Sequence, residues 1–354
     1  MSLAYDVIPV TIVTGFLGSG KSTLLADVLK GDAARDTAVL VNEFGEVGLD
    51  HLLIGEVEAQ TVLLDNGCIC CAIRGELKDA LATLFSRRAR GEVPPFSRVV
   101  LETTGLATPA PIVATLLGDQ IVSSHYSIGA IVTVVDALNA AQQQARHPEW
   151  LAQVAAADRL LISKADLAED AVVDALESML AQLNPAARIM RRTQRDDASL
   201  VIDVAANAHE FTDFVRRSGS RDVQAIGAIG NARPLASLNA HRGKLSGIES
   251  FCIDFDEPLD WPVFTLWFTM LLNRHGDNIL RVKGLLALEG AQLPVVVHAV
   301  HHLVHPVLHL DAWPDGARHS RLVFIAEHLD GDAVRDSYRR FSRHLHPHNA
   351  ESVD

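Results

Sequence analysis

Two short stretches of this sequence carry residues whose types and spacing could do chemistry. Residues 15–22 hold three glycines and end in Lys21-Ser22, the pattern of a loop whose backbone N–H groups cradle phosphates. Residues 68–71 hold three of the four cysteines of the chain. Thiolates bind soft and borderline metal ions. A domain that contains both stretches could couple metal handling to nucleotide hydrolysis.

The phosphate-binding loop lies between an expected strand and an expected helix, which is the context that this motif requires. We expect Lys21 to contact the β- and γ-phosphates, the Ser22 hydroxyl to ligate Mg²⁺, and Thr23 to support the α-phosphate. The helix adds the positive end of its dipole. The predicted nucleotide contacts in this loop are Gly15, Gly18, Ser19, Gly20, Lys21, Ser22 and Thr23.

A second polar element follows the apolar residues 99–101, where Glu102 ends an expected strand and Gly105 comes three residues later. The Glu102 carboxylate can hold Mg²⁺ through water or orient the attacking water. The Gly105 amide can sense a γ-phosphate. With Lys21 these two residues form the predicted catalytic set. An ordinary strand end at the surface is the alternative interpretation.

A third element, Ser163-Lys164-Ala165-Asp166, follows another expected strand. Asp166 can accept hydrogen bonds from both N1–H and N2–H₂ of guanine, and the Lys164 stem can lie along the base, which favours GTP over ATP. The pattern resembles the Asn-Lys-x-Asp guanine motif, with Ser163 in place of asparagine. That asparagine usually ties the base-binding loop to the phosphate-binding loop. We therefore expect its replacement by Ser163 to weaken nucleotide affinity.

The three thiolates suit a metal site with an open fourth position that can release its ion. Zinc takes thiolates tetrahedrally, and Cu(I) also accepts them. Buried small side chains and redox chemistry are the alternatives for these cysteines. The predicted ligands are Cys68, Cys70 and Cys71, with Glu43 as the foremost candidate for the fourth and Glu46 and His51 as others. Both glutamates could instead be solvated loop charges.

The overall composition excludes several classes of protein. The chain has 354 residues and a formal net charge of −13 at pH 7, so we expect it to repel nucleic acid. We see neither a signal peptide nor an apolar run of the ~20 residues that cross a bilayer. The expected protein is therefore cytoplasmic with no membrane partner. In that compartment clustered cysteines are metal or redox groups rather than disulfides.

Histidine is frequent, with 16 residues in the chain. Two sets of these histidines lie close together in the sequence and could bind metal. The favoured explanations for them are half-buried positions on strands for the first set and a solvated tail for the second. One set lies in the expected C-terminal domain and the other near the end of the chain: His298, His301, His302, His305 and His309, then His344, His346 and His348.

Strands alternate with helices over about the first 200 residues, which predicts an α/β P-loop NTPase fold, a mostly parallel sheet with helices on both faces. We expect this domain at 1–205, a linker at 206–245, a smaller α+β domain at 246–346 and a tail at 347–354. The expected strands are 7–13, 39–42, 60–64, 99–102, 128–136, 159–163, 250–255, 294–300 and 322–326, and the expected helices are 22–29, 76–90, 170–183, 261–273 and 333–345. Trp267 and Phe268 are expected in the core, and a homodimer is left open.

The motifs at 15–22, 67–71, 102–105 and 163–166, with residues 42–46, resemble those of the CobW-type GTPases. These are P-loop metallochaperones related to the urease- and hydrogenase-maturation GTPases. The cysteine element is the specific marker, because ordinary P-loop GTPases lack it. The C-terminal part is similar to the small second domain of that family. The resemblance implies slow GTP hydrolysis with Mg²⁺, Zn²⁺ or another divalent metal such as Co²⁺ at the cysteines, and delivery to a client.

We therefore expect a GTP-hydrolysing metal chaperone whose metal release to a client metalloprotein is coupled to hydrolysis. A metal buffer with a structural nucleotide is one alternative. A P-loop kinase acting on a small molecule is another, and it would prefer ATP. Within the leading class the client is open among zinc enzymes, cobalt insertion or other cobalamin-pathway enzymes, and nitrile hydratases.

Overall fold

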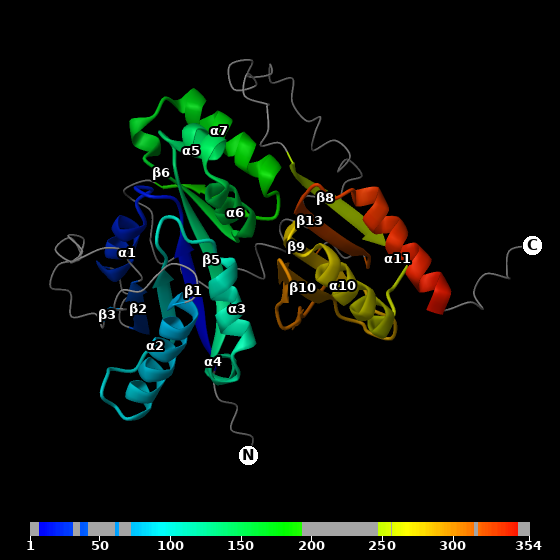
Figure 1. Ribbon diagram of the computed structural model, residues 1–354, viewed down its shortest axis with the longest axis horizontal. Helices are drawn as coiled ribbons and strands as arrows, with labels where there is room; N and C mark the ends of the chain where they lie inside the picture. Colours follow the sequence, from blue (N-terminus) through cyan, green and yellow to red (C-terminus); the bar gives the residue numbers. More distant parts are fainter. Residues whose placement is uncertain are drawn as a thin grey trace, which may run out of the picture. The chain divides into compact units, whose positions relative to one another are not determined.

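The computed structural model describes residues 7–30, 36–41, 61–63, 72–192, 247–255, 257–314 and 318–345. The chain divides into two compact units, one of residues 1–181 and 187–209 and the other of residues 182–186 and 210–354. Each unit is built around its own sheet (Figure 1). The expected linker 206–245 and tail 347–354 lie outside the described residues.

The first unit contains a seven-stranded sheet in the order β3-β2-β4-β1-β5-β6-β7, and every neighbouring pair is parallel. The connection after β1 leads to β2 on one side, and the connection after β4 leads across β1 to β5 on the other, so the carboxyl ends of β1 and its neighbours form the crevice where such sheets bind ligands. The strands are β1(Ile8–Thr14), β2(Thr37–Val41), β3(Thr61–Leu63), β4(Arg98–Glu102), β5(Tyr126–Asp136), β6(Arg159–Ser163) and β7(Arg188–Arg191).

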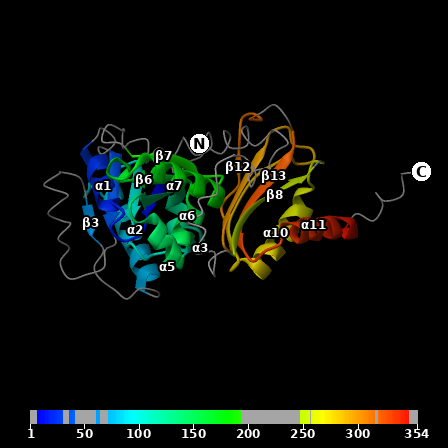
Figure 2. The same ribbon diagram turned by 90° about the horizontal axis from the view of Figure 1, so that it is seen from above.

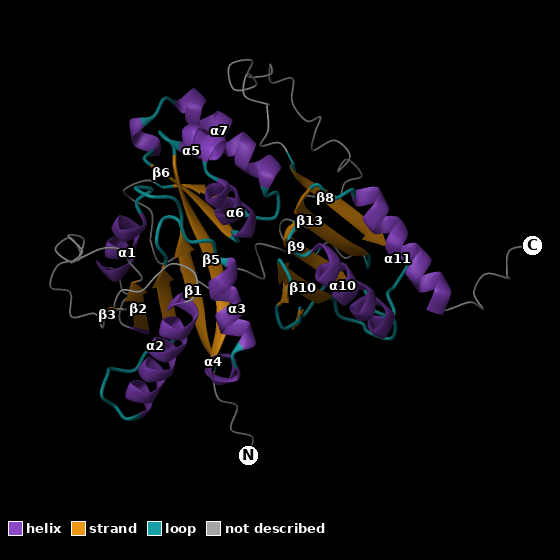
Figure 3. Cartoon of the chain, viewed as in Figure 1, coloured by secondary structure: helices purple, strands orange, loops and turns teal. Residues whose placement is uncertain are grey.

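Helices cover both faces of this sheet (Figure 3), which explains why β2 and β6 are buried at every position. Helix α1(Lys21–Lys30) packs Leu24, Leu25 and Val28 against one face, with Val132 and Val134 of β5. Helix α6(Pro148–Ala156) lies on the other face, the one that Thr133 faces. The remaining helices are α2(Ala72–Ala89), α3(Ala110–Gly118), α4(Gln120–His125), α5(Ala140–Arg146) and α7(Asp170–Leu183). The expected P-loop NTPase fold is confirmed.

The second unit is an antiparallel sheet in the order β11-β10-β9-β13-β8, with β12 paired to β10. Helices α10(Trp261–His275) and α11(Gly331–Leu345) cover the same face of this sheet (Figures 1 and 2). Trp267 and Phe268 belong to the core between helices and sheet, as expected. The strands are β8(Ile248–Phe255), β9(Ile279–Leu286), β10(Val295–Val300), β11(Leu303–Val304), β12(Leu308–His309) and β13(Ser320–Glu327).

Every expected strand and helix is present, with ends that differ by a few residues. The sequence reasoning missed the strands β7, β9, β11 and β12 and the short helices α3 to α6 between β4 and β6. Strand β9 was not predicted because Arg281, Lys283 and Gly284 interrupt its apolar pattern, although all eight of its residues are buried. None of the described helices is long and apolar enough to span a membrane.

Gly284 gives a test of the packing in the second unit. A Cβ added there would lie 2.2 Å from Leu322 Cδ2 and 2.9 Å from Val297 Cγ2, so Gly284→Ala overpacks the core. We expect the free energy of unfolding to fall by about 1–3 kcal/mol in urea denaturation. Gly118→Ala is the control, since nothing lies within 4 Å of an added Cβ at that position. Equal stability of Gly284→Ala and the unsubstituted protein would contradict this packing.

Candidate functional site

The phosphate-binding loop connects β1 to α1 and depends on its glycines. Gly15, Gly18 and Gly20 have φ angles of 141°, 72° and 95°, which side chains other than that of glycine disfavour. At Gly15 an added Cβ would also lie 2.3 Å from Val134 O. The backbone therefore curls tightly over β5, as the sequence motif requires.

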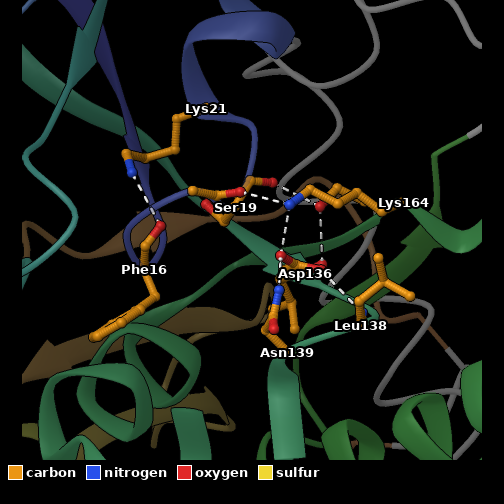
Figure 4. A network of polar contacts seen from close by, with 10 residues as sticks. Phe16, Ser19, Lys21, Asp136, Leu138, Asn139 and Lys164 are labelled. Atoms are coloured by element: carbon orange, nitrogen blue, oxygen red, sulfur yellow. Dashed lines mark hydrogen bonds and ion pairs between the residues drawn. The ribbon is translucent and has the colours of Figure 1, made fainter. Parts of the chain in front are cut away.

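The Lys21 ammonium lies inside the turn of this loop and binds its carbonyl oxygens. Lys21 is 8% exposed, and its Nζ donates to Gly15 O at 2.9 Å and to Phe16 O at 3.2 Å (Figure 4). Ser19 is fully buried, and its N–H donates to Phe16 O at 3.1 Å. The loop thus holds one positive charge among turned backbone groups, an arrangement that suits an anion.

The predicted magnesium residues lie together. Ser22 Oγ donates to Glu102 Oε1 at 2.9 Å, and Glu102 ends β4 directly beside β1. A hydroxyl and a carboxylate oxygen are hard donors of the kind that Mg²⁺ takes from proteins, so the donor set fits that ion. Thr23 is exposed on α1, where its carbonyl oxygen accepts from Arg192 Nη2 at 3.5 Å.

The turn after β4 rests on the phosphate-binding loop. Thr103 N donates to Val13 O at 3.0 Å, and Thr103 Oγ1 donates to Thr14 Oγ1 at 2.9 Å. A Cβ added to Gly105 would lie 2.6 Å from Leu17 N. Gly105 is therefore in contact with the backbone of the loop.

Residues 163–166, which are predicted to bind the base, are tied to the same loop. Ser163 Oγ donates to Ser19 O at 2.6 Å, and Lys164 Nζ donates to Gly18 O at 2.8 Å. The shorter hydroxyl thus still reaches a loop carbonyl, and the expected loss of nucleotide affinity at Ser163 stays a prediction. Lys164 has a left-handed φ of 55°, and Asp166 follows it, exposed, on the 3₁₀ helix η3(Ala165–Leu167).

Asp136 is a site residue that sequence reasoning missed. It ends β5, is 1% exposed, and accepts from Lys164 Nζ at 2.7 Å (Figure 4). Its carboxylate also accepts from Leu138 N at 2.9 Å and from Asn139 Nδ2 at 2.8 Å. Burial raises the pKa of the Asp136 carboxyl, but the hydrogen bonds from Lys164, Asn139 and Leu138 outweigh it, so the pKa lies below its ordinary value. The missed signal is a carboxylate that ends an apolar strand, as Glu102 does.

The predicted metal ligands Cys68, Cys70, Cys71 and Glu43, and the candidates Glu46 and His51, lie outside the described residues. Within the described ranges, no group of three or more His, Cys, Asp or Glu side chains could hold a metal ion.

Two of the C-terminal histidines form hydrogen bonds with backbone carbonyls at the end of α10. His302 Nδ1 lies 2.9 Å from Leu272 O, and His301 Nδ1 lies 3.0 Å from Gly276 O. Because carbonyl oxygens accept, each Nδ1 is the donor, and the two rings cap the end of α10. His346 and His348 lie outside the described residues.

The ion pair of Asp136 and Lys164 makes stability depend on pH. Asp136→Asn keeps the shape but removes the charge, so we expect the free energy of unfolding at pH 7 to fall by about 1–3 kcal/mol. Because the folded pKa of Asp136 is lowered, its contribution is complete above the ordinary carboxyl pKa of about 4 and is lost as the pH falls through the folded pKa. Urea denaturation of both proteins between pH 7 and pH 3 measures this. A stability gap that stays constant over that range would contradict it.

Known proteins are similar to this chain over most of its length. The chain is 32% identical to the zinc chaperone YjiA of Escherichia coli (strain K12), over 94% of this chain and 98% of that protein. It is 29% identical to the zinc chaperone CobW of Pseudomonas aeruginosa, over 94% of this chain and 91% of that protein. A crystal structure of Zn(II)-bound YjiA GTPase from E. coli is similar, with a TM-score of 0.67, 27% identity, and coverage of 95% of this chain and 99% of that one.

Family models match both units of the chain and confirm the resemblance seen in the sequence. Residues 9–191 match the nucleotide-binding domain of CobW/HypB/UreG, and residues 248–341 match the cobalamin synthesis protein cobW C-terminal domain. The chain therefore belongs to the CobW/HypB/UreG family and combines its nucleotide-binding domain with the CobW C-terminal domain.

Proposed function

We propose that this protein is a GTP-hydrolysing metal chaperone that binds Zn²⁺ and passes it to a client metalloprotein. One observation carries the nucleotide part of the proposal: Ser163 and Lys164 contact Ser19 and Gly18 directly. These contacts join a loop suited to reading guanine to a loop suited to holding phosphates. Such a junction is the basis of a guanine nucleotide site rather than of a general anion site.

Each residue of the site then has a role in the nucleotide reaction. Lys21 offsets the charge of the β- and γ-phosphates, and Asp166 accepts from the guanine edge. Ser22 and Glu102 would hold Mg²⁺, which supplies charge neutralisation at the phosphates when bound. Glu102 also orients the attacking water, and the Gly105 amide faces the γ-phosphate.

The metal part rests on the sequence and on the relatives. Three clustered thiolates with Glu43 supply the ligand types that zinc takes. Relatives that span nearly the whole chain are named zinc chaperones, and one solved relative is Zn(II)-bound. We therefore assign Zn²⁺ to Cys68, Cys70 and Cys71, ahead of Co²⁺.

The sheet topology supports coupling between the two sites. Val41 of β2 pairs with Leu63 of β3 and with Glu102 of β4, so the three strands end at the same edge as the phosphate-binding loop. Glu43 follows β2 after two residues, and Cys68 follows β3 after five residues. A change at the γ-phosphate therefore acts on the strand ends that precede the metal ligands.

Guanine recognition is tested by Asp166→Asn. A carboxylate accepts two guanine N–H groups, whereas an asparagine amide can donate to the C2 carbonyl of xanthine and accept from its N1–H. We expect GTP affinity to fall at least tenfold and XTP affinity to rise, measured by competition against a fluorescent GDP. Asp174→Asn, an exposed aspartate on α7, is the control and leaves both affinities unchanged. Undiminished GTP affinity in Asp166→Asn would contradict this role.

Coupling is tested by titrating the reduced protein with Zn²⁺ against a chelating indicator, first in Mg·GDP and then in a non-hydrolysable Mg·GTP analogue. We expect zinc affinities that differ about tenfold, or ~1.4 kcal/mol of coupling, because coupling requires differential affinity. The Cys68→Ala/Cys70→Ala/Cys71→Ala protein should lose the high-affinity site.

Cys252→Ala is the matched cysteine control. Burial raises the pKa of the Cys252 thiol to about 11, so this side chain is not a thiolate at neutral pH. Its substitution should leave zinc affinity unchanged. Tight zinc binding of equal strength in both nucleotides would instead favour a metal buffer with a structural nucleotide.

A further inference from the structure

Gln153 is a buried side chain of helix α6 that the proposed reaction does not use. It is fully buried, and its amide Nε2 donates to Gly105 O at 3.1 Å and to Ala107 O at 2.9 Å. Both carbonyls belong to the turn that carries the expected γ-phosphate sensor. One side chain therefore holds this turn at two points. Gln153 is 48 residues after Gly105 and 46 residues after Ala107 in the sequence.

The turn is also held by the end of β1 and by the phosphate-binding loop. Thr103 bonds to Thr14 at 2.9 Å, and Gly105 lies so close to Leu17 that a Cβ would be 2.6 Å from its nitrogen. The turn thus lies between the loop and α6. With the Gly105 carbonyl bound to Gln153, the peptide groups around Gly105 have a fixed orientation relative to the loop.

Gln153 is itself well supported. Thr133 Oγ1 of the core strand β5 donates to Gln153 O at 2.7 Å. At the start of α6, the His147 ring lies 4.4 Å from the Phe16 ring of the phosphate-binding loop, between ring centroids. The helix that carries the amide is therefore fixed both to the sheet and to the loop, which is what a precise support needs.

We propose that Gln153 is the positioning residue of the γ-phosphate-sensing turn and sets the strength with which the site distinguishes a triphosphate from a diphosphate. The inference rests on the proposed GTPase function. Because GDP has no γ-phosphate, losing the two hydrogen bonds affects triphosphate binding and hydrolysis and spares GDP binding. A purely structural glutamine would affect both nucleotides alike.

Two substitutions remove the amide donor in different ways. Gln153→Met has about the same volume and no donor. Gln153→Glu keeps the shape but turns carboxylate oxygens toward the carbonyls of Gly105 and Ala107. We expect affinity for the non-hydrolysable Mg·GTP analogue to fall about tenfold in Gln153→Met and further in Gln153→Glu. The single-turnover hydrolysis rate should fall at least tenfold, and Mg·GDP affinity should stay within twofold.

Gln143→Met is the matched control, since Gln143 is also a buried glutamine and lies on α5. It should leave both affinities and the rate within twofold. If Gln153→Met does not fold, Gln153→Asn replaces it, because the shorter side chain keeps an amide but withdraws it from both carbonyls. Equal losses for GDP and the GTP analogue, or no loss for either, would overturn the inference. The unsubstituted full-length protein separates this result from the proposed function: if it neither binds nor hydrolyses GTP, the proposed function itself is wrong.

Discussion

The site depends on the ion pair between Lys164 and Asp136, which joins three separate loops at one edge of the sheet. Lys164 follows β6, Asp136 ends β5, and the ammonium also donates to Gly18 O in the loop after β1. The Asp136 carboxylate is 1% exposed, and breaking such a pair leaves a buried charge uncompensated. The strand order brings these loops to one edge, and the pair fixes their relative positions.

The same edge receives the remaining functional segments from the other side of β1. Ser22 and Glu102 meet there through a hydrogen bond of 2.9 Å, and β2 and β3 end beside β4. In the proposed function, one parallel sheet would serve three chemical tasks, base recognition, phosphate binding and metal ligation, without extra elements. Each task comes from the first residues after a different strand, which is the general property of ligand sites in such sheets.

Much of this arrangement could be predicted from the sequence, because the strands of the first unit are continuous apolar runs that end in recognisable polar motifs. The phosphate-binding loop is local, so its glycines sufficed to predict it. Gln153 could not be predicted, because its partners lie 46 and 48 residues away and nothing in its neighbourhood is distinctive. The contact of Ser163 with Ser19 could not be predicted, because a hydroxyl reaches a loop carbonyl only when the two backbones lie close, a distance that no sequence pattern states. Strand β9 was missed because buried cations at Arg281 and Lys283 are rare in strands.

The contacts on the two sides of the site differ in kind. Base recognition is supported by a charge-assisted bond at Asp136 and a short hydroxyl bond at Ser163, and charge-assisted bonds contribute about 1.5–3 kcal/mol each. The γ-phosphate turn is supported by the neutral amide of Gln153, whose bonds contribute about 0.5–1.5 kcal/mol each. Allosteric coupling is typically 1–3 kcal/mol. The two bonds of Gln153 together contribute about 1–3 kcal/mol, the same size as such a coupling. The support of the turn that contains Gly105 is therefore of the size that the proposed coupling requires.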